Sequence, residues 1–339
     1  MHGPLSVTDA EWEKFQRDGY IKLGKLLSTN ELRELQQRID DIMLGRAAVP
    51  YEQMLMQLDS TTGKYDDAGE QTKGFKGATL DYRKIQDLEF DSLFLRYMQR
   101  PIFRDICARL LGPDADVSVF RAMFMNKPAR RGTWLPWHQD RWGELDRDPL
   151  ITIWTALDAA TIANGCVQVI PGSHRLGVIN PSHHSAFLNV DQTAEHVSSD
   201  RVVYLELQAG EVALLHNWLL HASDVNRSPG SRRAFSVCYM DAATQTRDGH
   251  RFSVVFGRDA MVPDNSSMQM ASYLDAAGRV NLLSVDLRPR QRRPNAHEAR
   301  LLYDRLHPSH RCRCVRCFGT DNSCESGRRP AAHERAESR

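Results

Sequence analysis

The chain has 339 residues, 41% of them hydrophobic, so it can bury a sizeable core as one large domain or two. Its formal net charge of +1 at pH 7 excludes a globally basic nucleic-acid binder. No apolar run reaches the roughly 18 residues of a membrane-spanning helix, and the first residues lack the basic and apolar segments of a signal peptide. We therefore expect a cytoplasmic protein that has a small-molecule substrate and neither nucleic acid nor membrane as a partner.

The first elements in the chain are predicted to be helices. Residues 8–11 and 28–31 each fit the capping box, in which a hydroxyl and a carboxylate satisfy the free amide groups at a helix start. The second box opens an amphipathic helix that runs to about Leu44. Between the two helices, residues 20–23 are typical of a short strand.

The next segment is predicted to contribute little to the core. Residues 50–80 carry four glycines among many charges, and we expect a long excursion there and not a core element. A third helix is expected from about Phe90 to Leu111, where Gly112 and Pro113 would end it.

After this helix the hydrophobic pattern changes to that of strands. Branched and aromatic residues, divided by turn signals, predict strands over residues 117–125, 150–157, 166–170, 202–207, 212–215 and 234–240. Many short strands after a helical opening indicate a mainly β protein with flanking helices. The predicted fold is a double-stranded β-helix, that is, a cupin-like jelly roll.

The C-terminal part differs in composition. Beyond about residue 287 arginine is frequent and core-forming runs are nearly absent, so we expect a single jelly-roll domain over 1–287 and a flexible tail, rich in Arg and Cys, over 288–339. Four of the seven cysteines lie in that tail: Cys312, Cys314, Cys317 and Cys324. They could hold zinc, but without paired Cys-x-x-Cys knuckles reactive thiols are the simpler interpretation. The other three lie in apolar stretches, as buried thiols of a reducing compartment would.

One motif carries potential for metal chemistry. His138 and Asp140 form the only His-x-Asp or His-x-Glu pair in the sequence, His221 lies farther along, and Arg232 follows it by eleven positions. Two imidazoles and one carboxylate are the ligands of non-haem Fe(II) oxygenases, and they leave open positions on the metal. Most His-x-Asp pairs are solvated turns, so the motif depends on its surroundings.

Those surroundings resemble the phytanoyl-CoA dioxygenase family of Fe(II)/2-oxoglutarate-dependent oxygenases. The similar segments, in matching order, are residues 126–128, 137–140 (Trp-His-Gln-Asp), 153–157, 164–174, 216–223 and 232–236. The resemblance implies the jelly-roll fold, Fe(II) as the metal and 2-oxoglutarate as a cosubstrate. It implies His138, Asp140 and His221 as the catalytic metal ligands, and Arg232, Ser223 and Lys127 as contacts of the cosubstrate.

Arginine suits the proposed role at position 232. Its planar, permanently charged fork can bind a carboxylate through two hydrogen bonds. On a strand the neighbouring Arg233 would face the other way, so only one of the two can enter the pocket.

The expected reaction is hydroxylation or oxidative ring closure of a polar small molecule, with release of succinate and CO2. Charged residues follow the ligand pair, and they are similar to those of bacterial oxygenases that act on sugar-containing antibiotic intermediates: Arg141, Glu144, Asp146, Arg147 and Asp148. Three alternatives stay open. The chain could be an acyl-CoA hydroxylase of the same family, a cupin-type dioxygenase without 2-oxoglutarate, or a non-catalytic jelly-roll binding protein.

Overall fold

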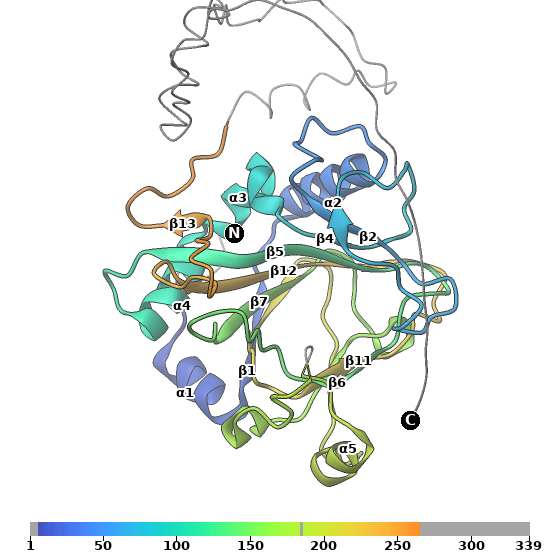
Figure 1. The fold of residues 1–339 in the computed structure, drawn as a ribbon, viewed down its shortest axis with the longest axis vertical. Helices are drawn as coiled ribbons and strands as arrows, with labels where there is room; N and C mark the ends of the chain where they lie inside the picture. Colours follow the sequence, from blue (N-terminus) through green and yellow to red (C-terminus); the bar gives the residue numbers. More distant parts are fainter. Residues whose placement is uncertain (1–5, 184–185, 265–339) are drawn as a thin grey trace, which may run out of the picture. The chain divides into compact units, whose positions relative to one another are not determined.

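The computed structural model describes residues 6–183 and 186–264 as two antiparallel sheets with helices against one of them (Figure 1). The helices are α1 (Asp9–Asp18), α2 (Thr29–Met43), α3 (Ser92–Met98), α4 (Pro101–Leu111) and α5 (Val190–His196). Short 3-10 helices span Leu88–Phe90, Ile162–Asn164 and Ser173–Leu176. The predicted boundary at residue 287 and the tail 288–339 with its cysteines lie outside the described residues.

The larger sheet has the strand order β1-β10-β7-β12-β5-β4-β2-β3, with β13 beside β5. Its strands are β1 (Tyr20–Lys25), β2 (Leu55–Leu58), β3 (Thr72–Lys73), β4 (Tyr82–Ile85), β5 (Val117–Lys127), β7 (Ile151–Ala156), β10 (Glu211–His216), β12 (Arg232–Asp241) and β13 (Val254–Phe256). The smaller sheet has the order β6-β11-β8-β9. Its strands are β6 (Leu135–His138), β8 (Val167–Val169), β9 (Val203–Leu205) and β11 (His221–Ser223).

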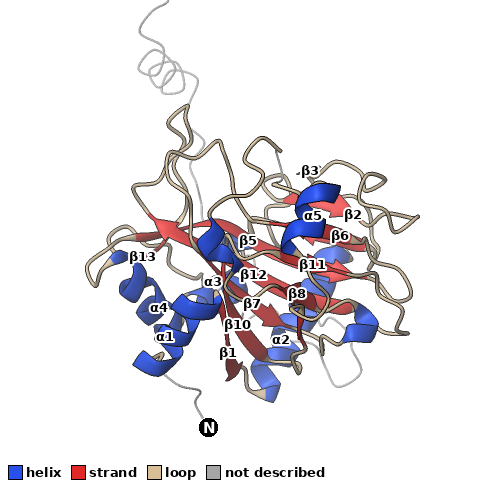
Figure 2. Ribbon diagram, turned by 90° about the horizontal axis from the view of Figure 1, so that it is seen from below, coloured by secondary structure: helices blue, strands red, loops and turns tan. Residues whose placement is uncertain are grey.

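Alternation along the central strands divides the core into two layers (Figure 2). Ile153 of β7 and Val237 of β12 pack with the apolar faces of α2, α3 and α4. Their neighbours Trp154 and Ala234 point the other way and pack between the two sheets. This is the predicted jelly roll with flanking helices, and its inter-sheet layer is where an internal site can form.

The first two helices begin where the sequence predicts. The Thr8 and Ser28 hydroxyls each accept a hydrogen bond from the backbone amide three residues on, at 3.3 Å. The carboxylates of Glu11 and Glu31 accept from the backbone amides of Thr8 and Ser28, at 2.9 Å. Both capping boxes are therefore complete, and α2 ends at Met43, one residue before the predicted end.

The single helix predicted from Phe90 to Leu111 is wrong. The segment contains a 3-10 turn, then α3, then α4, and the break falls between Met98 and Pro101. Proline lacks an amide hydrogen and disfavours helical geometry in the residue before it, and Arg100 is extended with ψ 142°. Pro101 therefore starts a new helix and cannot continue the old one, and Gly112, with φ 103°, ends α4 as expected.

The prediction that residues 50–80 lie outside the core also needs correction. β2 and β3 fall in this segment and extend the larger sheet through β4. Met54 and Met56 are fully buried there. Strands of four and two residues are too short to show an alternating pattern among so many charges and glycines, which is why the sequence does not reveal them.

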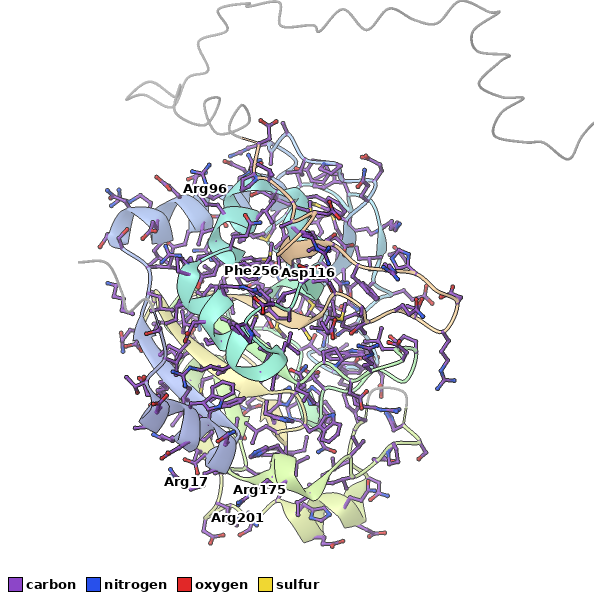
Figure 3. The ribbon with its side chains drawn as sticks, turned by 90° about the vertical axis from the view of Figure 1, so that its left-hand side faces the viewer. Arg17, Arg96, Asp116, Arg175, Arg201 and Phe256 are labelled. Atoms are coloured by element: carbon purple, nitrogen blue, oxygen red, sulfur yellow. The ribbon has the colours of Figure 1, made fainter. Side chains whose placement is uncertain are left out.

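β13 pairs with the first residues of β5, inside the larger sheet. Figure 3 shows Asp116, which precedes β5, near Phe256 of β13, and Phe256 pairs with Val117. The Asp116 carboxylate accepts a hydrogen bond from the backbone amide of Arg258 at 2.9 Å.

Among the described residues, none of the helices has the length and apolarity needed to cross a membrane.

Candidate metal centre

The site begins with two strands of the smaller sheet. β6 ends at His138 and β11 begins at His221, and these two residues are partners in the antiparallel ladder. Directly opposed residues on paired strands have side chains on the same face, so the two rings meet, with centroids 4.0 Å apart. Asp140 lies two residues beyond the end of β6. Ligand atoms of all three residues lie within 4.8 Å of one another.

Hydrogen bonds orient the two imidazoles. Nδ1 of His138 lies 2.8 Å from the Pro136 carbonyl oxygen, and Nδ1 of His221 lies 2.9 Å from that of Leu219. A carbonyl only accepts, so each Nδ1 carries the proton and donates it, and each Nε2 keeps a free lone pair. These Nε2 atoms lie 3.9 and 3.8 Å from Asp140 oxygens, too far for hydrogen bonds. Two imidazole Nε2 atoms and a carboxylate oxygen therefore converge on one point, as a metal ion requires.

Electrostatics favour the ligand forms of these residues. Burial lowers the pKa of His138 to about 3, with the positive charge of His221 as the second cause. Burial alone would raise the pKa of Asp140, but positive charge on His221, His138 and Arg121 outweighs it and lowers that pKa. Neutral imidazole and ionised carboxylate are the states that bind a divalent metal.

The backbone of Asp140 is held in place by Asn217. The backbone amide of Asp140 donates to the Asn217 carbonyl oxygen at 2.7 Å. The Asn217 side chain donates to the Pro149 carbonyl at 2.8 Å, and its oxygen accepts from the Thr152 hydroxyl at 2.7 Å. This buried network ties Asp140 to β7 and β10, so its direction is set by the larger sheet.

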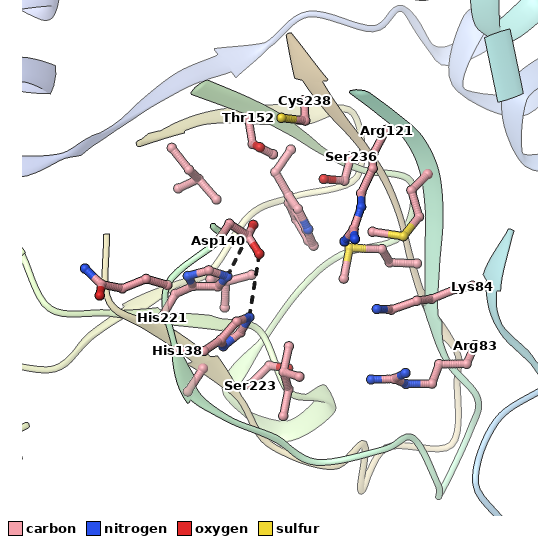
Figure 4. A pocket seen from close by; sticks show the side chains of 18 of the residues that line it. Arg83, Lys84, Arg121, His138, Asp140, Thr152, His221, Ser223, Ser236 and Cys238 are labelled. Atoms are coloured by element: carbon pink, nitrogen blue, oxygen red, sulfur yellow. Dashed lines mark ion pairs between the residues drawn. The ribbon is translucent and has the colours of Figure 1, made fainter. Parts of the chain in front are cut away.

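A cavity of about 420 Å³ opens beside the three residues, between the two sheets (Figure 4). Arg232, at the start of β12, lines it and is only 3% exposed. Its Nε and Nη1 atoms are buried and have no hydrogen-bond partner, and its guanidinium lies 5.5 Å from the centre of the Trp154 ring. Burial lowers the pKa of Arg232 to about 10, so the group stays charged at neutral pH. A buried cation with free N–H groups calls for an anion.

Ser223 lies on the same side of the cavity as the metal residues. It ends β11, two residues after His221, is 5% exposed and lines the cavity. Its hydroxyl can therefore reach a molecule held there.

Lys127 is placed differently from its expected role. It is not among the residues that line the cavity in the described part of the chain, and its ammonium group donates to the Thr133 carbonyl at 2.5 Å. Burial, and then the positive charge of Arg232, lowers the pKa of Lys127 well below its usual value. The structure thus gives Lys127 a partner in the loop that follows β5.

Arg233 faces away from the cavity, as strand alternation predicts. Its Nε and Nη2 donate to the Asp158 carboxylate at 2.8 and 2.9 Å. Its Nη1 donates to Asp40 of α2 at 2.6 Å. Arg233 thereby links the sheet to the helical layer.

The sequence did not reveal three cations on the opposite wall of the cavity. Arg83 and Lys84 come from β4, and Arg121 comes from β5 (Figure 4). The alternation of Arg121, Met123 and Met125 on a predicted strand was a signal that could have placed Arg121 on the inner face. Arg83 and Lys84 gave no such signal, because β4 was not expected.

Comparison with known proteins identifies the family. The sequence model of "Phytanoyl-CoA dioxygenase (PhyH)" matches residues 15–234, more than half of the chain. A probable phytanoyl-CoA dioxygenase of Caenorhabditis elegans is 29% identical over 69% of this chain and 76% of its own length. The phytanoyl-CoA dioxygenase domain-containing protein 1 of Mus musculus is 28% identical over 70% and 91%.

Solved structures share the fold. EctD from S. alaskensis, solved with 2-oxoglutarate and 5-hydroxyectoine, has a TM-score of 0.55 and 21% identity over 75% of this chain and 82% of its own. The non-haem α-ketoglutarate-dependent carbocyclase SnoK from nogalamycin biosynthesis has a TM-score of 0.53 and 19% identity over 72% and 87%. The predicted jelly roll and oxygenase class are confirmed, with iron and 2-oxoglutarate as the cofactors at the level of the family. The chain belongs to the phytanoyl-CoA dioxygenase family.

Proposed function

We propose that the chain is an Fe(II)/2-oxoglutarate-dependent dioxygenase in which His138, Asp140 and His221 bind the iron. The observation that carries this proposal is the convergence of their ligand atoms within 4.8 Å, in a cavity that also contains the buried and unpartnered Arg232. Nitrogen and carboxylate ligands on one face of the metal suit Fe(II) and leave positions for other ligands.

The cosubstrate, 2-oxoglutarate, would be held by residues that line the cavity beside the proposed iron ligands. The fork of Arg232 would bind the carboxylate of 2-oxoglutarate that is remote from the metal, through charge-assisted hydrogen bonds. Ser223, at the end of β11, would donate a further hydrogen bond to that carboxylate. Trp154, beneath the guanidinium, would keep the fork in place and exclude water from it.

Iron with bound 2-oxoglutarate would activate dioxygen and, as the cosubstrate becomes succinate and CO2, supply the oxidant for a C–H bond of the substrate. The protein's contribution is to orient that bond and to keep the cavity dry. Hydroxylation and oxidative ring closure use the same ligands, and the substrate's position selects between them.

The substrate class that we propose is a polar small molecule, such as a sugar-containing antibiotic intermediate. Polar groups support this, since the cavity is lined by Gln57, Tyr65, Gln71, Arg83, Lys84, Arg121, Arg141 and Glu144 besides the residues named above. The relatives named for phytanoyl-CoA support an acyl-CoA as the second candidate. A substrate panel for succinate release should contain both classes.

The first experiment is an anaerobic optical titration of the metal-free protein with Fe(II) and then 2-oxoglutarate. A weak visible charge-transfer band is expected when the keto acid chelates the iron. Arg232→Gln should abolish the band at 2-oxoglutarate concentrations that saturate the parent protein. Arg258→Gln is the control, because its side chain is 92% exposed.

The same titration distinguishes the two alternatives to this proposal. Iron binding without the band in the parent protein would favour a cupin-type enzyme that does not use 2-oxoglutarate. Failure to bind iron at all would favour the non-catalytic binding protein.

A further inference from the structure

The wall of the cavity opposite the metal residues carries more positive charge than the proposed cosubstrate needs. Arg83, Lys84 and Arg121 extend into the cavity there (Figure 4), whereas the carboxylates that line it are Asp140 and Glu144. Asp140 is assigned to the metal, and the two negative charges of 2-oxoglutarate are assigned to the iron and to Arg232. A cationic wall inside a partly enclosed cavity attracts anions.

Of these cations, Arg121 is the one whose guanidinium has an unused donor. Its Nε atom is buried and makes no hydrogen bond, and among residues 6–183 and 186–264 no carboxylate lies at ion-pair distance from it. Arg83, in contrast, donates to Gln57 at 2.9 Å and lies over the Tyr65 ring at 4.9 Å. A buried donor without a partner is unfavourable, and an acceptor placed beside it would remove that penalty.

An irregularity of β5 lies directly before Arg121. In the ladder with β12, Cys238 pairs with Arg121 but Tyr239 pairs with Val119, so Phe120 is an extra residue on β5. Such a bulge redirects side chains toward one face of the sheet. Phe120 accordingly packs against Trp142 of the loop after the metal ligands, with ring centroids 4.7 Å apart.

These two aromatic rings hold the guanidinium. The Arg121 Cζ atom lies 4.9 Å from the centre of the Trp142 ring and 5.2 Å from that of Phe120. Stacking against aromatic rings fixes the plane of a guanidinium and leaves its in-plane N–H groups free to bind a carboxylate or phosphate. The guanidinium is therefore held in a fixed plane with its buried Nε donor available to an oxyanion.

The site is coupled to the metal centre through the chain. Trp142 follows Asp140 by two residues, which span at most about 7 Å of backbone. An anion on Arg121 would therefore lie beside the metal centre, within the volume that the substrate has to occupy. A cavity of about 420 Å³ has room for 2-oxoglutarate and a substrate of the size of a sugar or an amino acid.

We propose that Arg121 binds an oxyanion group of the substrate, a carboxylate or a phosphate, and thereby orients the substrate over the metal centre. This inference deepens the proposed function and rests on it. It restricts the polar substrates to those with a negative charge near the oxidised carbon. Neutral analogues would leave the Nε donor of Arg121 buried and unpaired.

The test uses the full chain loaded anaerobically with Fe(II) and 2-oxoglutarate, with the visible band as proof of loading. Potassium sulfate and potassium acetate are titrated separately at constant ionic strength, and tryptophan fluorescence is followed. Trp142→Phe identifies the reporting residue. We expect saturable binding of at least one anion, and Arg121→Gln should weaken it about tenfold or more. Arg258→Gln serves as the exposed control.

The two anions distinguish the two forms of the group. Preference for sulfate indicates a tetrahedral phosphate-like group, and preference for acetate indicates a carboxylate. Equal anion affinity in the parent protein and in Arg121→Gln would overturn the proposal, as would a loaded protein that binds neither anion. A weaker 2-oxoglutarate band in Arg121→Gln would also overturn it, because Arg121 would then belong to the cosubstrate. The same anion titrations are made on the protein without Fe(II) and 2-oxoglutarate. A missing band in the parent protein then refutes the oxygenase assignment, while the comparison with Arg121→Gln still tests the anion site.

Discussion

His138 and His221 are direct partners across the β6–β11 ladder, and their rings lie 4.0 Å apart between centroids. Each ring also donates its Nδ1 proton to a carbonyl two residues before it in the chain. The distance between the two Nε2 atoms is therefore set by strand pairing and backbone hydrogen bonds before any metal arrives. A preformed pair of this kind binds a metal with little reorganisation.

Removing one of these rings should remove the metal. His138→Ala leaves one imidazole and one carboxylate, and we expect Fe(II) affinity to fall by more than about 100-fold. Equilibrium dialysis under anaerobic conditions measures this loss. His250→Ala, at an exposed position in the loop between β12 and β13, should bind iron like the parent protein. Unchanged affinity in His138→Ala would refute the assigned ligand set.

Ser223 offers a test of the cosubstrate side that does not disturb the metal. Ser223→Ala removes one hydrogen bond to a carboxylate, so the 2-oxoglutarate affinity should fall about tenfold while Fe(II) affinity stays the same. The visible band, titrated once with 2-oxoglutarate and once with Fe(II), gives both values. Ser236→Ala is the matched control, since Ser236 lines the same cavity from β12. Equal losses in both variants would show that Ser223 has no specific role.

The proposed metal ligands could be singled out from the sequence because two of them form a local motif. His138 and Asp140 are two residues apart, and Arg232 has a fixed spacing from His221. The strands that bring them together could not be predicted, because β6 has four residues and β11 has three. Such short strands show no period, and only the sheet around them defines them.

The opposite wall was missed for a different physical reason. Lys84 lies on β4, which follows a segment whose charges and glycines hide its strands. Arg121 lies on a strand that was predicted, and its alternation with Met123 and Met125 was the signal for its face, but the bulge that leaves Phe120 unpaired beside it has no mark in the sequence. The role of Lys127 was inferred from a resemblance alone. In the structure its ammonium group donates a hydrogen bond to the Thr133 carbonyl.

Arg233 should matter for stability and not for the site. It bridges Asp158 and Asp40, and its side chain is 17% exposed while those of its partners are 19% and 32% exposed. Arg233→Ala would leave both carboxylates without their cation, and we expect a loss of about 2 kcal/mol in the free energy of unfolding, measured with urea. The 2-oxoglutarate band should remain at full intensity in this variant.

A surface pair provides the control for that measurement. Arg227 pairs with Asp224 at 2.7 Å, but its side chain is 64% exposed. Arg227→Ala should therefore leave the free energy of unfolding nearly unchanged. An equal loss of unfolding free energy in Arg233→Ala and Arg227→Ala would show that the ion pairs of Arg233 stabilise the protein no more than a surface pair does.

Glu89 should make stability depend on pH near neutrality. Burial raises the pKa of Glu89 to about 7; one carboxyl oxygen accepts from the Ser253 hydroxyl at 3.2 Å, and the other has no partner. A folded-state pKa above the unfolded value of roughly 4.3 means that the folded chain holds the proton more tightly. This contribution is complete below about pH 4.3, declines as pH rises and is lost above about pH 7.

Glu89→Gln removes this titration while keeping the shape of the side chain. The variant should match the parent near pH 4 and be more stable at pH 8, by at most about 3 kcal/mol. Urea unfolding at a series of pH values between 4 and 8 measures the difference. Burial also raises the pKa of Asp87, so some slope should remain in the variant. Parallel pH profiles for the two proteins would mean that Glu89 titrates normally, with its carboxylate reached by water.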